Sequence, residues 1–276
     1  MPFANLTDVH CYYELNGEGE PLLLVPGLGS TCRVWDPVAN QLAMNFSLIA
    51  VDNRGIGKSI ARCLPQTVRD FSADLVELLD HLQVPRAHVM GLSLGGVIAQ
   101  RFAMDHPDQV SRLVLMSSAH RFGPYLREMA KFVGQARRWF PTPMFARTME
   151  VLCTGPTYLD ANPHRVVERL REMRKEAVSS KAVIRQLYAL SASRFEPEEY
   201  DIRAATLVIS GEFDSLIPHC YAQHMADLIE DSSFVMLRKS GHNPINECPK
   251  ELEALLVAFL QTGTVDVRGG NSQPAA

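Results

Sequence analysis

The stretch Gly91-Leu92-Ser93-Leu94-Gly95-Gly96 lies between a predicted short buried strand at 86–90 and a predicted helix at 97–104. A strand that turns at once into a helix through Gly-x-Ser-x-Gly is typical of a nucleophile elbow, in which the serine occupies a strained turn. Gly91 and Gly95 are expected to lack side chains because strand and helix approach closely there. The turn would expose the Ser93 hydroxyl at a helix N-terminus, where the helix dipole and free N–H groups favour negative charge.

Apolar runs and helical patterns alternate on both sides of this stretch. The run at 22–25 is continuously apolar, as expected of a strand buried on both faces of a parallel sheet. The apolar spacing at 68–82 predicts an amphipathic helix. The alternation predicts an α/β fold with a mostly parallel, doubly wound sheet. Further strands are expected at 46–51, 112–116, 205–210 and 233–237.

The alternation stops between residues 120 and 200, where the pattern is helical with proline breaks. We predict an α/β core at 1–119 and 201–261, a helical cap at 120–200 and a disordered tail at 262–276. Residues 121–200 hold 14 Lys and Arg against 9 Asp and Glu, a net charge of +5. Two interpretations are open: solvated helix faces, or a basic lid that attracts anionic substrates.

The composition of the whole chain narrows the class of protein. A net charge of −4 over 276 residues gives no general attraction to nucleic acid or anionic membranes. No apolar run approaches the roughly 20 residues of a membrane span, and the N-terminus lacks signal-peptide character, so a cytoplasmic protein is expected. Six scattered cysteines and nine histidines show no metal-ligand spacing, so no metal is expected. Oligomeric state is not predicted.

The segment 52–59 imitates two cofactor motifs. Gly57-Lys58-Ser59 resembles the end of a phosphate-binding loop, but Asp52 occupies the position of the required upstream glycine. Gly55-x-Gly57 lacks the third glycine of a dinucleotide fingerprint. No cofactor is therefore expected, and Asp52 is interpreted as holding the turn at Arg54.

A serine hydroxyl is a poor nucleophile at neutral pH and needs a base, which in turn needs an orienting carboxylate. Ser93, Asp214 and His242 each follow a predicted strand, and ligand sites in open α/β sheets gather at that edge. Asp214 is the predicted acid and His242 the predicted base. His120 and His219 also lie near strand ends and are kept as residues that could line the pocket.

An oxyanion intermediate needs two backbone donors. One should be the N–H of Leu94, directly after the nucleophile. The other should come from the loop after the strand at 22–25, and Leu28 is the predicted donor. Gly27 and Gly29 would let that backbone approach closely.

Over residues 10–260 the chain resembles α/β-hydrolase-fold serine hydrolases. The resemblance rests on the motifs above and on the order Ser…Asp…His. Pro26-Gly27 stands where the family usually has His-Gly, which bears on the shape of the oxyanion loop. The segments 87–96 and 110–115 are similar to the 3-oxoadipate enol-lactonase and small carboxylesterase group.

The resemblance implies hydrolysis of a small-molecule ester or lactone, with an anionic substrate favoured by the basic-lid interpretation. A carbon–carbon bond (vinylogous diketone) hydrolase and a cofactor-free haloperoxidase or perhydrolase use the same residues and stay open. A non-catalytic ligand receptor on this fold is the alternative from a different class.

Overall fold

The structure, a computed structural model, describes residues 2–176, 178–193, 195 and 200–265. Its strands are β1 (Phe3–Asn5), β2 (Val9–Asn16), β3 (Glu20–Val25), β4 (Phe46–Val51), β5 (Ile60–Ala61), β6 (Ala87–Leu92), β7 (Val110–Met116), β8 (Thr206–Gly211) and β9 (Ser232–Leu237). They form one sheet in the order β1-β2-β4-β3-β6-β7-β8-β9, and β5 pairs with β2. Pairing is parallel from β4 to β9, whereas β2 runs antiparallel to β4.

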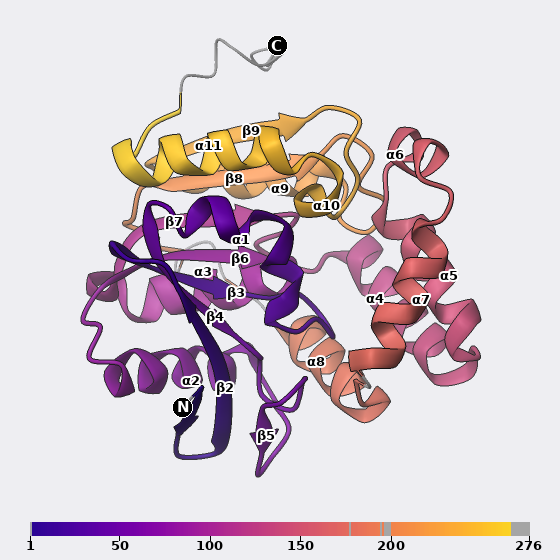
Figure 1. Cartoon of the computed structure of the whole chain (residues 1–276), viewed down its shortest axis with the longest axis horizontal. Coiled ribbons are helices and arrows are strands. Elements are labelled where there is room, and N and C mark those ends of the chain that lie inside the picture. The colour runs from indigo at the N-terminus through magenta and orange to yellow at the C-terminus, as the bar shows by residue number, and fades with distance from the viewer. Residues whose placement is uncertain (1, 177, 194, 196–199, 266–276) are drawn as a thin grey trace.

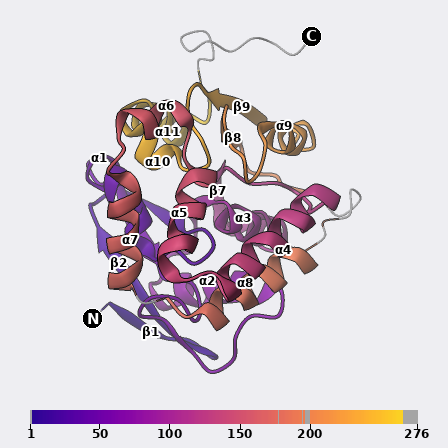
Figure 2. The ribbon, with the colours of Figure 1, turned by 90° about the vertical axis from the view of Figure 1, so that its right-hand side faces the viewer.

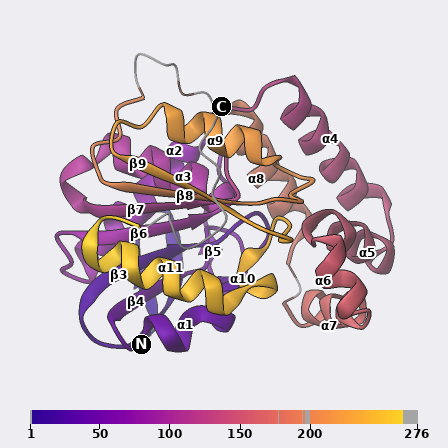
Figure 3. The same cartoon turned by 90° about the horizontal axis from the view of Figure 1, so that it is seen from above.

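Helices cover both faces of this sheet. They are α1 (Asp36–Leu42), α2 (Val68–His81), α3 (Leu94–Asp105), α4 (Pro124–Trp139), α5 (Thr142–Cys153), α6 (Pro156–Ala161), α7 (Arg165–Glu176), α8 (Ser180–Ala192), α9 (His219–Asp227), α10 (Pro244–Glu247) and α11 (Pro249–Thr262), with short 3-10 helices at Cys32–Trp35 and Pro107–Gln109. Helices α1, α10 and α11 lie on one face, and α2, α3 and α9 lie on the other (Figures 1 and 3).

Each face of the sheet has its own apolar core. Successive side chains of a strand point to opposite faces, so the continuous apolar run of β3 serves both. Leu24 packs in the core that includes Phe259 of α11. Leu23 packs in the core that includes Phe102 of α3. The mostly parallel α/β sheet predicted from the sequence is confirmed.

Helices α4 to α8 follow β7 and precede β8, and we call them the helical insertion. The insertion lies beyond the carboxyl ends of the parallel strands (Figures 1 and 2). The predicted cap boundaries at 120 and 200 stay a prediction. Of the predicted disordered tail, Thr262 is the last residue of α11, and 266–276 lie outside the described residues.

Among the helices that the structure describes, none has the length and apolar character needed to cross a bilayer.

Candidate active site

Ser93 sits between β6 and α3 with φ 55° and ψ −114°, a strained backbone conformation for a residue other than glycine. Its N–H donates to the Met116 carbonyl at 2.8 Å, and the Ser118 hydroxyl donates to the Ser93 carbonyl at 3.0 Å. A Cβ at Gly91 would overlap the carbonyl of Gly95. The close approach that the glycines were expected to permit is therefore present, and hydrogen bonds to β7 and its following loop help to fix the strained turn.

Asp214 follows β8 and His242 follows β9, and the structure brings the two side chains together. His242 Nδ1 lies 2.7 Å from Asp214 Oδ2. Asp214 Oδ1 accepts the N–H groups of Leu216 at 3.0 Å and Ile217 at 2.8 Å. Both side chains are buried. Because Nδ1 faces the carboxylate, Nε2 is the ring nitrogen left to exchange a proton with a nucleophile.

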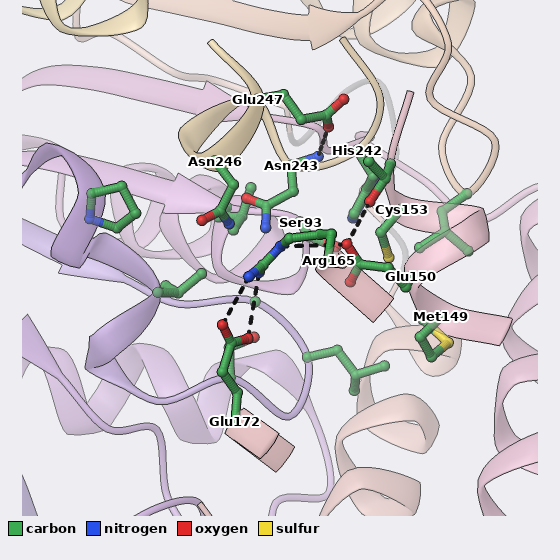
Figure 4. Close-up of a pocket in the computed structure, with 18 of the residues that line it drawn as sticks. Ser93, Met149, Glu150, Cys153, Arg165, Glu172, His242, Asn243, Asn246 and Glu247 are labelled. Atoms are coloured by element: carbon green, nitrogen blue, oxygen red, sulfur yellow. Dashed lines mark hydrogen bonds and ion pairs between the residues drawn. The ribbon is translucent and has the colours of Figure 1, made fainter. Parts of the chain in front are cut away.

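Ser93 and His242 line the same cavity, which has a volume of about 340 Å³ (Figure 4). Gly27 and Leu28 line it too, in the segment 26–29 that we call the oxyanion loop. A Cβ placed on Gly27 would lie 3.4 Å from the Ser93 Cβ, so this loop runs directly beside the serine. Leu94 is the first residue of α3. The structure thus brings the predicted oxyanion residues next to the predicted nucleophile, and their role as donors stays a prediction.

The helical insertion holds the loops around this cavity. Gln186 of α8 is fully buried, and its Oε1 accepts the N–H of Gly29 in the oxyanion loop at 2.8 Å. On the other side, the N–H of His242 donates to the carbonyl of Cys153 in α5 at 2.8 Å. The insertion therefore contacts both the oxyanion loop and the segment 240–243, which we call the histidine loop.

Glu247 of α10 joins the histidine loop to the insertion. Its Oε2 accepts the N–H groups of Gly155 at 2.8 Å and Gly241 at 2.9 Å, and its Oε1 accepts that of Asn243 at 3.3 Å. Burial raises the pKa of Glu247 above its ordinary value, and the three donors act in the opposite direction. One carboxylate thus connects both neighbours of His242 to the segment before α6.

The part of the cavity wall that the helical insertion forms is not basic. Arg165 of α7 lies 3.5 Å from Glu150 and 2.9 Å from Glu172 (Figure 4). It also lies 3.3 Å from Glu168. Besides His242, the charged side chains lining the cavity are two basic and four acidic: Arg33, Asp36, Glu150, Arg165, Glu172 and Glu247. The +5 charge of residues 121–200 therefore does not extend to the described cavity wall.

Asp52 holds the turn at Arg54 through the backbone, as interpreted from the sequence. Its carboxylate accepts the N–H of Lys58 at 2.9 Å, across the turn that contains Arg54, and the N–H of Cys32 at 2.8 Å. The Arg54 side chain forms a buried bidentate pair with Asp74 of α2, at 2.6 and 2.7 Å. That partner lies 20 residues further along the chain, and local sequence does not reveal it.

His120 and His219 were kept as residues that could line the pocket, but neither of them borders the described cavity. His120 is buried, packed against the rings of Tyr200 and His224. Burial, with smaller effects of His224 and Arg121, lowers the pKa of His120 to about 4.

Sequence reasoning missed the residues that hold and line the cavity, namely Gln186, Glu247 and Arg165. Glu247 had one local signal, its place five residues after His242. Gln186 had none, because its partner Gly29 lies 157 residues away.

Known proteins resemble this chain along most of its length. It is 24% identical over 259 residues to a protein of Azorhizobium caulinodans whose name describes it as a candidate carbamate hydrolase, RutD; the match covers 94% of this chain and 98% of the relative. The structure of a thermophilic esterase from Thermogutta terrifontis matches with a TM-score of 0.81 and 26% identity, covering 93% and 95% of the two chains. The enol-lactonase of Burkholderia xenovorans matches with a TM-score of 0.85 and 24% identity, covering 94% and 100%.

The last of these likenesses shows the fold alone. The family assignment comes from the sequence model of the alpha/beta hydrolase fold, which matches residues 20–247. That range contains the elbow, the Asp214 loop and the histidine loop. The resemblance stated from the sequence is thereby confirmed, and the chain belongs to the α/β hydrolase fold family.

Proposed function

We propose that this hydrolase cleaves a carboxylic ester or lactone through an acyl-enzyme intermediate. Ser93 would be the nucleophile, His242 the base and Asp214 the orienting acid. The observation that carries the proposal is the 2.7 Å contact between His242 Nδ1 and Asp214 in a cavity that Ser93 also lines. This arrangement leaves Nε2 to serve the hydroxyl.

In the first half-reaction, the Ser93 Oγ attacks the substrate carbonyl carbon while its proton passes to His242 Nε2. The carbonyl oxygen gains negative charge, which the N–H groups of Leu28 and Leu94 stabilise. The bond to the leaving oxygen then breaks, and that oxygen takes the proton from Nε2. The acyl group stays on Ser93.

In the second half-reaction, His242 Nε2 accepts a proton from water, and the hydroxide oxygen attacks the acyl carbon. Collapse of the second tetrahedral intermediate releases the carboxylic acid and returns the proton to Ser93. Asp214 holds the imidazole in the tautomer that both steps require and stabilises its positive charge.

The cavity wall favours an uncharged substrate. All three guanidinium nitrogens of Arg165 already face the carboxylates of Glu150, Glu168 or Glu172. A substrate carboxylate would have to compete with these groups in a wall that carries more acidic than basic side chains. We therefore expect a p-nitrophenyl ester with an uncharged acyl group to be cleaved faster than one whose acyl group ends in a carboxylate.

The test is turnover of a panel of p-nitrophenyl esters and lactones by the unmodified protein and by Ser93→Ala. We expect turnover by the former, and a loss on the order of 10⁶ in kcat in the variant. Stoichiometric labelling of Ser93 by a fluorophosphonate would count against an inert receptor. Retained turnover by pure Ser93→Ala would refute the nucleophile, and faster cleavage of the carboxylated esters would refute the substrate preference.

A second candidate is carbamate hydrolysis, which the names of the curated relatives favour. The same Ser93 would attack a carbamate carbonyl, and His242 would protonate a leaving nitrogen or oxygen. Parallel assays with an ester and a carbamate that share one leaving group compare the two directly. Vinylogous diketones, and peroxide with acetate, test the two rival triad reactions.

A further inference from the structure

We propose that Gln186 and Glu247 are positioning residues through which the helical insertion sets the geometry of the catalytic groups. The inference rests on the proposed function, because it gives both side chains a part in the same reaction. Gln186 would hold the oxyanion loop, and Glu247 would hold the histidine loop.

The Gln186 contact reaches the oxyanion loop at its last residue. Gln186 is fully buried in α8, and its Oε1 accepts the Gly29 N–H at 2.8 Å. Val183, one turn earlier in α8, also packs here: a Cβ on Gly29 would lie 3.1 Å from its Cγ2. Gly29 has φ +64°, so its backbone is one that other residues rarely adopt. The hydrogen bond fixes the peptide that follows Leu28. The Leu28 N–H belongs to the preceding peptide, so Gln186 would restrain this donor through its neighbour.

The Glu247 contacts enclose His242 from both sides. Its carboxylate accepts the N–H groups of Gly241 and Asn243, the two neighbours of His242, and also that of Gly155 in the insertion. The backbones are so close that a Cβ on Gly241 would lie 2.6 Å from the Gly155 nitrogen. The position of the His242 imidazole therefore depends on the Glu247 carboxylate, which also binds the insertion through Gly155.

Ser93 is held by the core, through hydrogen bonds to β7 and the loop after it. The oxyanion loop and the histidine loop, in contrast, are held partly by the helical insertion. A small shift of the insertion would move the Leu28 donor and the His242 base relative to a fixed nucleophile. Misplacement of reacting groups lowers the rate of the chemical step more than it lowers substrate binding. Loss of either contact should thus lower kcat and leave KM nearly unchanged.

The experiment compares Gln186→Met and Glu247→Gln with the unmodified protein. Methionine keeps the volume of Gln186 but accepts no comparable hydrogen bond. Glutamine at 247 has one amide oxygen for three N–H donors, so its N–H₂ group must face at least one of them. We expect kcat for a neutral p-nitrophenyl ester to fall about tenfold or more, less than the 10²–10³ lost when an oxyanion donor is removed, with KM within about twofold. Gln186→Glu keeps an acceptor oxygen and should regain part of kcat.

Two control variants separate positioning from general loosening. Leu187→Ala weakens α8 beside Gln186, and Glu251→Gln removes an exposed carboxylate from α11. Both should keep kcat within about twofold of the unmodified protein. An equal fall of kcat in Leu187→Ala, or a rise of KM without a fall of kcat in Gln186→Met and Glu247→Gln, would overturn the proposal.

A readout without turnover keeps this inference separate from the proposed function. Amide hydrogen exchange should quicken at 26–31 in Gln186→Met and at 240–243 in Glu247→Gln. If the unmodified protein cleaves no ester, lactone or carbamate, the proposed function fails, and the exchange rates still decide whether the insertion holds the loops. Unchanged exchange in both variants would overturn the positioning role.

Discussion

Replacement of Asp214 by asparagine should move the ring proton of His242 from Nδ1 to Nε2 and leave the imidazole in place. Asp214 Oδ1 accepts two backbone N–H groups, from Leu216 and Ile217, and Oδ2 faces His242 Nδ1. In Asp214→Asn, the single amide oxygen should occupy the Oδ1 position, because the amide N–H₂ cannot accept from those donors. The N–H₂ group then faces Nδ1, which must become the acceptor. The proton moves to Nε2, and the imidazole can no longer act as a base toward Ser93.

The expected loss follows from this tautomer change. Asparagine at the orienting acid of a Ser-His-Asp triad costs about 10⁴ in kcat, equivalent to about 5.4 kcal/mol of transition-state stabilisation. The two N–H contacts to position 214 should survive, so the melting temperature should change little. The assay is kcat and KM for a neutral p-nitrophenyl ester, together with thermal unfolding.

Asp108→Asn is the matched control, since Asp108 is an exposed carboxylate away from the cavity. It should leave kcat unchanged. If pure Asp214→Asn kept more than a tenth of the original kcat, the orientation argument would be refuted. If instead the variant lost activity because it unfolded, the two N–H contacts would be shown to need the charge of the carboxylate.

Three further predictions concern stability. Asp74→Ala leaves the Arg54 guanidinium buried without its partner, so the free energy of unfolding in urea should fall by about 3–5 kcal/mol; an unchanged midpoint would contradict this. Gly95→Ala places a Cβ against the backbone at the end of β3, so little folded protein should form, and a normal melting curve would show that α3 can move away. The pKa of His120, lowered to about 4 by burial, lies below its unfolded value near 6.5. Its contribution to stability is therefore present above pH 6.5 and should be lost as the pH falls toward 4, by up to about 3 kcal/mol. His120→Phe should flatten the pH dependence of the melting temperature, and parallel curves for the two proteins would refute it.

The fold could be predicted because its signals are local. The expected strand at 46–51 is β4, and the expected helix at 68–82 is α2, which ends one residue earlier. Short elements such as β1, β5 and α10 were not predicted, because two to four residues are too few to show a period. The convergence of Ser93, Asp214 and His242 could be predicted for a related reason: each stands at the end of a clear strand, and a parallel sheet brings those ends to one edge.

The contacts that hold the site could not be predicted, because they join a side chain to a distant backbone group. Nothing in the residues around Gln186 indicates that its amide meets Gly29. The same holds for Glu247, which meets Gly155 across 92 residues. A side chain that binds a backbone N–H requires only that its partner is not proline, so the hydrogen bond itself does not reveal the partner in the sequence.

The net charge of residues 121–200 does not indicate the charge of the cavity wall, because it counts side chains without regard to where they point. Arg165, Glu168 and Glu172 stand three and seven residues apart, a spacing that places them on one face of α7. That spacing could have indicated a guanidinium paired within its own helix. The contribution of Glu150 comes from α5 and required the packing of two helices. A segment of net positive charge can therefore border a cavity whose wall holds more acidic than basic side chains, and a bound substrate contacts that wall. This is why we expect an uncharged ester to react faster than a carboxylated one in spite of the +5 charge of residues 121–200.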